Sequence, residues 1–251
     1  MKRVGIIPCR FGSSRFPGKP LASILGKPMV AWTYKSALAS SKLDRIYVTS
    51  ESKEILDAAE KAGAPTILTS SDCKTGTDRV KEAVEQLSDS LSKDAIVVNI
   101  QGDEPLIRGD HIDACVSLLE CDVSSPMSTI AVEETNDVTF QDPNVVKAVK
   151  DVNGNALYFS RAPIPFQNSS QRKSFLRHIG LYAYRRNFLL SYSKLQESFL
   201  EDAEGLEQLR VLEAGEKIKI ESVKGPCYPG VDTPNDLEAI VKIVLKQRDH
   251  E

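Results

Sequence analysis

Cysteine is scarce in this sequence and follows no metal-binding spacing. The five cysteines are an odd number, and no two of them form a CxxC pair; they are Cys9, Cys73, Cys115, Cys121 and Cys227. A disulfide framework or a zinc site is therefore not expected, and we predict a reducing, cytoplasmic location. Cys9 lies beside a polar loop and could be reactive, but we favour the interpretation that it is a small, buried thiol.

The sequence also lacks an excess of positive charge and any long apolar run. Its 32 Lys and Arg residues are outweighed by 35 Asp and Glu, which leaves a net charge of −3, and no basic tract breaks this balance. A groove for nucleic acid is therefore not expected. The apolar run that follows the first three residues is too short for a signal peptide, and no stretch reaches membrane-spanning length, so we expect no membrane insertion.

Two common phosphate-binding motifs are absent, but the sequence has a glycine-containing loop of a different pattern that carries several cations. Gly12 and Gly18 are separated by five residues and Pro20 follows Lys19, which excludes a Walker A loop, and no GxGxxG opens a helix. The open loop after the apolar strand at 4–7 carries three cations, Arg10, Arg15 and Lys19. Glycine lets backbone N–H groups turn inward and cations offset phosphate charge, so the loop is a candidate polyphosphate site. A solvated surface turn is the alternative.

Apolar β-branched runs alternate with helical patterns through the first half of the chain. Strands are expected at 4–7, 45–49, 66–69 and 95–100, and helices at about 28–39, 53–62, 78–91 and 109–120. This alternation predicts an α/β fold with a mixed, mostly parallel sheet.

The alternation is lost in the second half of the chain. Short strands are expected at 128–132, 145–150 and 156–160, followed by a helix at 205–215 and a closing strand and helix. We therefore predict one domain, residues 1–251, in which roughly 125–200 form a smaller region with antiparallel strands and a candidate dimer surface.

Two aspartates lie in tight loops next to predicted elements. Asp103 follows the apolar strand at 95–100 in QGDEP, and Asp232 lies in GVDTP ahead of the last helix. Ligands of open α/β sheets bind at the carboxyl ends of strands, and proteins commonly hold Mg²⁺ through one or two carboxylates plus phosphate oxygens. Both aspartates are therefore candidate ligands of a magnesium–nucleotide complex. The alternatives are a turn or helix cap for Asp103 and an Asx turn for Asp232, with Pro234 as the first helical residue.

Polar residues of the second half point to an anionic substrate. Arg161 follows a predicted strand in YFSRAPIP, and arginine binds carboxylate or phosphate bidentately, so an acidic sugar or a phosphate is its candidate ligand. The alternatives are a surface ion pair for Arg161 and a hydrogen-bonded core position for His178. Glu207 and Gln208 would by default be polar residues on a helix surface.

Six segments together resemble a known family. RFGSSRFPGKPL, QGDEP, YFSRAPIP, RHIGLYAYR, EGLEQLRVLEAGEKI and GVDTPNDLE occur in this order. Their conjunction, from about residue 3 to about residue 240, resembles the 3-deoxy-manno-octulosonate cytidylyltransferases, also called CMP-Kdo synthetases. The resemblance implies a Rossmann-like, three-layer nucleotide-diphospho-sugar transferase fold and a homodimer formed through the smaller region. It also implies Mg²⁺-dependent transfer of CMP from CTP to Kdo, with pyrophosphate as second product, which activates Kdo for lipopolysaccharide biosynthesis.

The resemblance also implies roles for individual residues. The positions matched to CTP binding are Arg10, Ser13, Ser14, Arg15, Lys19, Arg79 and Gln101. The positions matched to the sugar are Gln101, Arg161, His178 and Gln208, with Tyr182 and Glu207 as weaker candidates. Asp103 and Asp232 match the magnesium ligands, and together with Lys19 and Arg15 they are the candidate catalytic residues. No protein nucleophile is required.

The chain departs from the family pattern in three places. Thr49-Ser50-Glu51 stands where relatives often have Thr-Asp, so a role for an aspartate there does not transfer. Phe166 stands where tryptophan is common, and Cys9 replaces a frequent alanine. Other functions stay open: a CMP-sialic acid synthetase, a catalytically silent nucleotide-binding relative and, from the residues alone, a glycosyltransferase that uses a nucleotide sugar.

Overall fold

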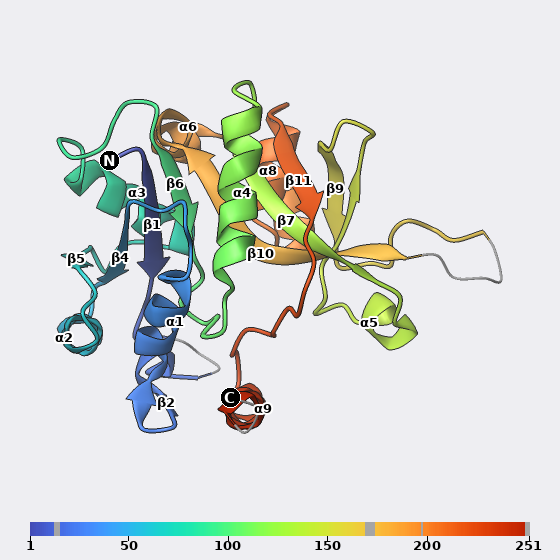
Figure 1. Ribbon diagram of the computed structural model, residues 1–251. Coiled ribbons are helices and arrows are strands. Elements are labelled where there is room, and N and C mark those ends of the chain that lie inside the picture. The colour runs from blue at the N-terminus through green and yellow to red at the C-terminus, as the bar shows by residue number, and fades with distance from the viewer. Residues whose placement is uncertain (13–15, 169–173, 197, 249–251) are drawn as a thin grey trace. The chain divides into compact units, whose positions relative to one another are not determined.

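The computed structural model describes residues 1–12, 16–168, 174–196 and 198–248, and it divides into two compact units (Figure 1). Unit 1 comprises Met1–Asp113 and Pro226–Glu251, and unit 2 comprises Ala114–Gly225. The smaller region predicted at roughly 125–200 lies within unit 2.

Unit 1 is built on four parallel strands. They are β1 (Arg3–Pro8), β4 (Arg45–Ser50), β5 (Thr66–Leu68) and β6 (Ile96–Asn99), paired in the order β6-β1-β4-β5. Every residue of β6 is buried, as expected for a strand covered on both faces. Because the chain runs from β1 through β4 and β5 before it returns beside β1, the strand order reverses between β1 and β6. The loops after these two strands therefore leave the sheet at a topological switch point, where ligands of such folds bind.

Helices α1 (Met29–Ala37), α2 (Lys53–Lys61) and α3 (Gly76–Gln86) lie between these strands along the chain. Helix α4 (Gly109–Cys121) follows β6 and runs from unit 1 into unit 2, and α9 (Pro234–Arg248) is the last element of the chain. The short elements are η1 (Lys19–Leu21), β2 (Ser23–Ile24) and β3 (Lys27–Pro28). Helix α3 begins two residues earlier than predicted, because Thr75 and Asp78 form a reciprocal capping box at its N-terminus.

Unit 2 has a mixed sheet with short helices. The antiparallel pair β7 (Met127–Glu134) and β10 (Phe175–Arg185) is joined by β11 (Ile218–Ser222), parallel to β7, and by β8 (Lys147–Lys150), which pairs with β10 and with β9 (Ala156–Ser160). The helices are α5 (Asp137–Gln141), α6 (Arg186–Ser191), η2 (Tyr192–Lys194), α7 (Phe199–Glu204) and α8 (Gln208–Glu213). The helix predicted at 205–215 is present as the shorter α8, and the separate helix α7 before it was not predicted; Gly205, with a left-handed φ of 63°, ends α7 before α8 begins.

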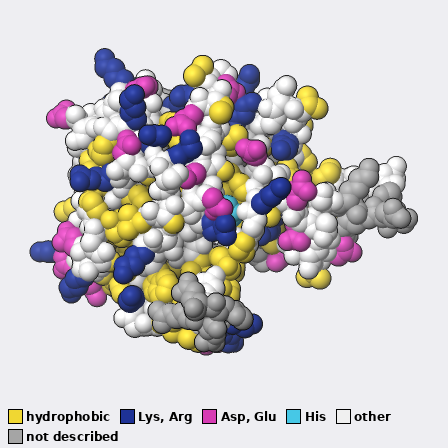
Figure 2. All heavy atoms as spheres, viewed as in Figure 1, with side chains coloured by type: hydrophobic (Ala, Val, Ile, Leu, Met, Phe, Trp, Pro, Cys, Tyr) yellow, Lys and Arg dark blue, Asp and Glu magenta, His cyan; other side chains and the backbone are white. Residues whose placement is uncertain are grey.

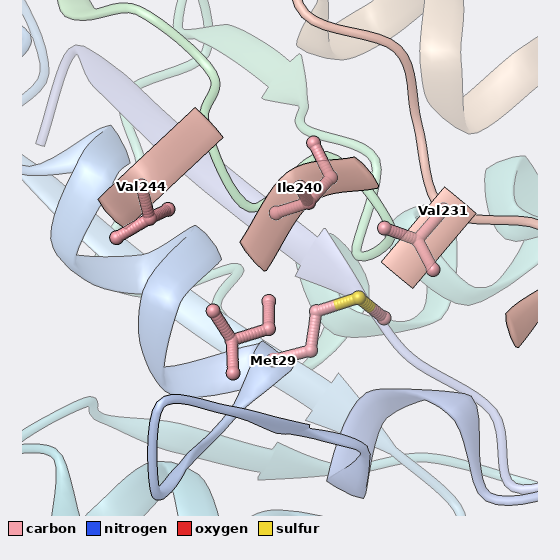
Figure 3. Packing of buried hydrophobic residues seen from close by; sticks show 5 residues of the cluster. Met29, Val231, Ile240 and Val244 are labelled. Atoms are coloured by element: carbon pink, nitrogen blue, oxygen red, sulfur yellow. The ribbon is translucent and has the colours of Figure 1, made fainter. Parts of the chain in front are cut away.

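A hydrophobic cluster of unit 1 fixes the segment that precedes α9. Ile24, Met29, Val231, Ile240 and Val244 are each at most 3% exposed and pack together; four of them are labelled in Figure 3. Burying a side chain of this size contributes roughly 1.5–3 kcal/mol. Val231 therefore holds its neighbours in the chain against β2, α1 and α9.

Charge is mixed on the visible surface. On the face shown in Figure 2, the described Lys and Arg side chains lie interspersed with Asp and Glu. Within the described parts of the chain, no helix combines the length and apolar character needed to cross a membrane.

Candidate active site

Lys19 lies between two carboxylates from distant parts of unit 1. Its Nζ donates to Asp103 Oδ2 at 2.7 Å and to Asp232 Oδ1 at 3.2 Å. The side chain of Lys19 is 14% exposed, whereas those of Asp103 and Asp232 are 31% and 48% exposed, so both carboxylates remain open to a ligand from solvent. The structure thus brings together three residues that sequence analysis selected from three separate loops.

Asp103 is placed by a glycine and by a main-chain hydrogen bond. A Cβ on Gly102 would lie 2.7 Å from the carbonyl oxygen of Pro8 and 2.8 Å from Cys9 Sγ, so only glycine lets this turn approach the end of β1. The N–H of Val231 donates to the carbonyl of Asp103 at 2.8 Å, which ties the two aspartate loops together. Burial, together with the negative charge of Asp103, raises the pKa of the Cys9 thiol to about 12. Cys9 is therefore a buried, unreactive thiol, which agrees with the interpretation favoured from the sequence.

The turn at Asp232 is made by its neighbours. Asp236 Oδ2 accepts from the N–H groups of Asp232 and Thr233, at 3.0 and 2.8 Å, and from Thr233 Oγ1 at 2.8 Å. Helix α9 begins at Pro234, which confirms that part of the prediction. The Asp232 carboxylate contacts Lys19, whereas Asp236 makes the turn. Sequence analysis missed Asp236, although Thr233 and Asp236 have the spacing of a capping box.

The remaining residues matched to CTP differ in their surroundings. Arg10 is exposed, Gln101 is partly buried after β6, and Ser13, Ser14 and Arg15 lie outside the described residues. Arg79 is only 5% exposed in its side chain, and its Nη2 lies 2.7 Å from Glu51 Oε2. Its Nη1 donates to Thr69 Oγ1 at 2.6 Å. The guanidinium of Arg79 is therefore engaged inside unit 1.

The paired carboxylates fit a magnesium ion. Asp103 and Asp232 both reach one ammonium nitrogen, so they are close enough to share one cation, and carboxylate oxygens are the donors that Mg²⁺ prefers. In the described part of the chain, no group of three or more His, Cys, Asp and Glu side chains could hold a metal. A pair suffices where phosphate oxygens and water complete the coordination.

In unit 2, Arg161 is held through both its backbone and its side chain. Its N–H donates to Glu204 Oε2 at 2.8 Å, and its Nε donates to the carbonyl of Glu204 at 2.8 Å. Its Nη1 donates to the carbonyl of Pro143 at 3.0 Å, and its own carbonyl accepts from Lys147 Nζ at 2.5 Å. A guanidinium has five N–H donors, so these bonds orient the side chain without using its full capacity.

His178 is a hydrogen-bonded residue of β10. Thr129 Oγ1 lies 2.9 Å from His178 Nε2 and donates to the carbonyl of Leu181 at 2.8 Å. A hydroxyl has one proton, so when that proton is donated to the Leu181 carbonyl, Nε2 carries the shared hydrogen and Nδ1 is the acceptor nitrogen. Burial lowers the pKa of His178 well below its usual range, which keeps the ring neutral at pH 7. The ring of Tyr182 lies 5.5 Å from that of His178, between centroids.

Gln208 and Glu207 are more buried than polar residues on a solvent-exposed helix surface. Gln208 is 3% exposed, and its buried Nε2 has no hydrogen-bond partner, which contradicts the default placement on a polar helix face. Glu207 is half-buried, and its carbonyl accepts from the Tyr192 hydroxyl at 2.9 Å. A buried amide without a partner costs free energy, so Gln208 is suited to a polar ligand.

Comparison with known proteins identifies the family. Residues 4–218 match a family model described as cytidylyltransferase. The chain belongs to the cytidylyltransferase family. It is 46% identical over 248 residues to the 3-deoxy-manno-octulosonate cytidylyltransferase of Syntrophobacter fumaroxidans, with 98% of each chain covered. It is also 46% identical over 233 residues to the 8-amino-3,8-dideoxy-manno-octulosonate cytidylyltransferase of Shewanella halifaxensis, covering 92% of this chain and 94% of the relative.

A solved structure agrees with these sequence matches. The structure of CMP:2-keto-3-deoxy-manno-octonic acid synthetase complexed with CTP matches with a TM-score of 0.92 and 37% identity, over 98% of this chain and all of that one. The resemblance to CMP-Kdo synthetases and the α/β fold with a mixed, mostly parallel sheet are therefore confirmed, and the chain is a nucleotidyltransferase. The roles of its individual site residues stay predictions.

Proposed function

We propose that this cytidylyltransferase uses Mg²⁺ to transfer CMP from CTP to Kdo, giving CMP-Kdo and pyrophosphate. The observation that carries the proposal is the contact of Lys19 Nζ with both Asp103 and Asp232, in loops beside the switch point of the unit 1 sheet. The names of the relatives, one for Kdo and one for its 8-amino analogue, support an eight-carbon acidic ketose as the acceptor.

The reaction is an in-line displacement at phosphorus. The anomeric 2-hydroxyl of Kdo attacks the α-phosphorus of CTP, the new O–P bond forms, and the bond to the β-phosphate oxygen breaks. Pyrophosphate leaves with the electron pair of that bond, and the hydroxyl proton is released to solvent. Holding two reactants in one geometry can remove about 7–11 kcal/mol of the barrier, so positioning suffices without a protein nucleophile.

Charged residues of unit 1 bind the nucleotide in this proposal. Lys19 and Arg10 offset the charge of the triphosphate, together with Arg15 in the loop between them. Asp103 and Asp232 would hold Mg²⁺ with phosphate oxygens, and the bound ion would stabilise charge that develops at the α-phosphate. Arg161, His178, Tyr182 and Gln208 would contact the acidic sugar, and the buried, unpartnered amide of Gln208 favours a polar ligand there.

A pyrophosphate-release assay tests the proposal. Purified protein is incubated with CTP, Kdo and Mg²⁺, and in parallel arms with each other nucleoside triphosphate, with 8-amino-Kdo, with sialic acid and with a chelator. We expect turnover with CTP and Kdo that the chelator abolishes. Faster turnover with sialic acid would indicate a CMP-sialic acid synthetase, and CTP binding without product would indicate a silent relative. Sedimentation of the same preparation checks the predicted homodimer.

A further inference from the structure

Glu51 connects the end of strand β4 to the start of the cationic loop. It is the residue directly after β4, and its Oε1 accepts from the N–H of Phe11 at 2.8 Å. Phe11 follows Arg10, so the carboxylate holds the backbone at the point where the loop leaves β1. The side chain of Glu51 is 21% exposed, and its hydrogen bond to the exposed Phe11 is charge-assisted, which strengthens it relative to a neutral pair.

Arg79 fixes the other oxygen of the same carboxylate. Its Nη2 lies 2.7 Å from Glu51 Oε2, and its Nη1 donates to Thr69 Oγ1 at 2.6 Å and to the carbonyl of Ser70 at 3.3 Å. Thr69 in turn accepts from the hydroxyl of Thr49 at 3.1 Å. Arg79 thus belongs to a buried polar network at the ends of β4 and β5, and that network determines where Glu51 lies.

The same hydrogen bonds continue to Lys19. The carbonyl of Phe11 accepts from the N–H of Gly18 at 3.1 Å, so these two described residues of the loop are tied together. Gly18 has φ 67° and directly precedes Lys19, whose ammonium meets Asp103 and Asp232. A continuous path therefore runs from Arg79 through Glu51, Phe11 and Gly18 to Lys19.

We infer that Glu51, held by Arg79, is a positioning residue that fixes Phe11, and through Gly18 also Lys19, before CTP binds. This inference rests on the proposed function, because CTP is the ligand of the loop. Arg79, which the family resemblance assigned to CTP, acts in this account through Glu51. Without the carboxylate, Phe11 and Lys19 would no longer be held in one arrangement, and part of the free energy of CTP binding would be spent on restoring it.

The variant Glu51→Ala tests the inference through a split between binding and turnover. We expect the dissociation constant for CTP, measured by calorimetry, and the KM for CTP to rise about 10- to 100-fold, as when a competent state is populated a tenth to a hundredth of the time. The kcat should stay within about threefold, because saturating CTP restores the loop. Glu51→Asp keeps the charge and should recover most of the affinity, whereas Glu51→Gln should recover less because it loses the ion pair.

Asp44→Ala is the matched control. Asp44 directly precedes β4, and its Oδ2 accepts from the N–H groups of Lys2 and Arg3 at 2.7 and 3.0 Å, at the opposite end of the same strand pair. Its loss removes a similar backbone anchor but should leave CTP affinity unchanged. Equal CTP affinity in wild type and Glu51→Ala would overturn the inference, as would an equal loss in Asp44→Ala. If the wild type binds CTP but transfers nothing to Kdo, the proposed reaction is wrong, but the ratio of the CTP dissociation constants of Glu51→Ala and wild type still decides the role of Glu51. A wild type that does not bind CTP overturns both the proposed function and this inference.

Discussion

Lys19, which is partly buried, and Lys147, which is fully buried, are lysines of different units with opposite kinds of partner. Lys19 Nζ meets the side-chain carboxylates of Asp103 and Asp232. Lys147 is fully buried, and its Nζ donates to three backbone carbonyls, those of Asp142, Val145 and Arg161, at 3.0, 2.6 and 2.5 Å. Burial lowers the pKa of Lys147. The residue type alone therefore does not reveal the role of these lysines, whereas the kind of acceptor does.

The two lysines differ in whether the ammonium group can leave its acceptors. Carboxylates that are partly open to solvent can take a metal ion, and their lysine can turn to an incoming phosphate, without any change in the backbone. Three partly buried carbonyls that converge on one ammonium lose a charged donor if it moves away, so they favour an ammonium that stays in place. Lys19 is thus suited to chemistry, and Lys147 is suited to holding α5, β8 and the segment at Arg161 together.

The largest effect is expected for Lys19→Met, and it should appear in activity. We expect the rate of pyrophosphate release to fall about 1,000-fold, the size typical for loss of one group that stabilises developing charge. The melting temperature should change little, since no buried carbonyl loses its donor. Lys27→Met, at an exposed position of β3, is the control and should keep both activity and stability. An unstable Lys19→Met protein with near-normal kcat would reverse the comparison.

Lys147→Met should show a smaller effect, and it should appear in stability. Three carbonyls lose a charged donor, but that of Asp142 keeps the N–H of Val145, so the loss falls mainly on the carbonyls of Val145 and Arg161. At roughly 1–3 kcal/mol for each unsatisfied group, we expect the free energy of unfolding in urea to fall by about 3 kcal/mol. Lys150→Met, at the exposed end of the same strand, should cost almost nothing. Equal unfolding midpoints for the two variants would show that the three carbonyls do not depend on Lys147.

The smallest effect is expected from His178, and it depends on pH. The folded pKa lies below the unfolded value of about 6.5, so below that pH the unfolded chain binds a proton that the folded chain does not. Stability should therefore decline as pH falls from 7 to 5, by up to about 1.4 kcal/mol per pH unit for this one group. His178→Gln keeps an N–H toward Thr129 and should show a shallower decline in urea midpoints. Parallel curves for the two proteins would contradict a depressed pKa.

The sequence predicted the regular parts of the fold well. Alternating apolar runs and helical patterns indicated the parallel strands of unit 1, and β9 has the predicted bounds, Ala156–Ser160. Strand ends in a parallel sheet share one edge, which is why Asp103 could be assigned to a ligand site near the first loop. The helix predicted at 205–215 is shorter in the structure, Gln208–Glu213, because leucine periodicity does not report the left-handed turn at Gly205 that ends α7.

Contacts between distant residues could not be predicted in the same way. Glu51 was judged only as a departure from a Thr-Asp pattern, because no local pattern links it to Phe11 or to Arg79. Lys147 was not singled out, since its three acceptors are backbone groups that meet only in the tertiary fold. The burial of Gln208 could not be predicted either, because helix periodicity placed this residue on the solvent-facing side of the helix.

The most direct test of the account is a double-mutant comparison of the two aspartates. Pyrophosphate release with CTP, Kdo and Mg²⁺ is measured for Asp103→Asn, Asp232→Asn and the double variant, each checked for a folded state by circular dichroism. If the two carboxylates serve one cation, each single variant should lose about 1,000-fold in kcat/KM, and the double variant should lose little more, because residues that act as a unit are not additive. Losses that multiply in the double variant, or a single variant with the wild-type rate, would contradict a shared site.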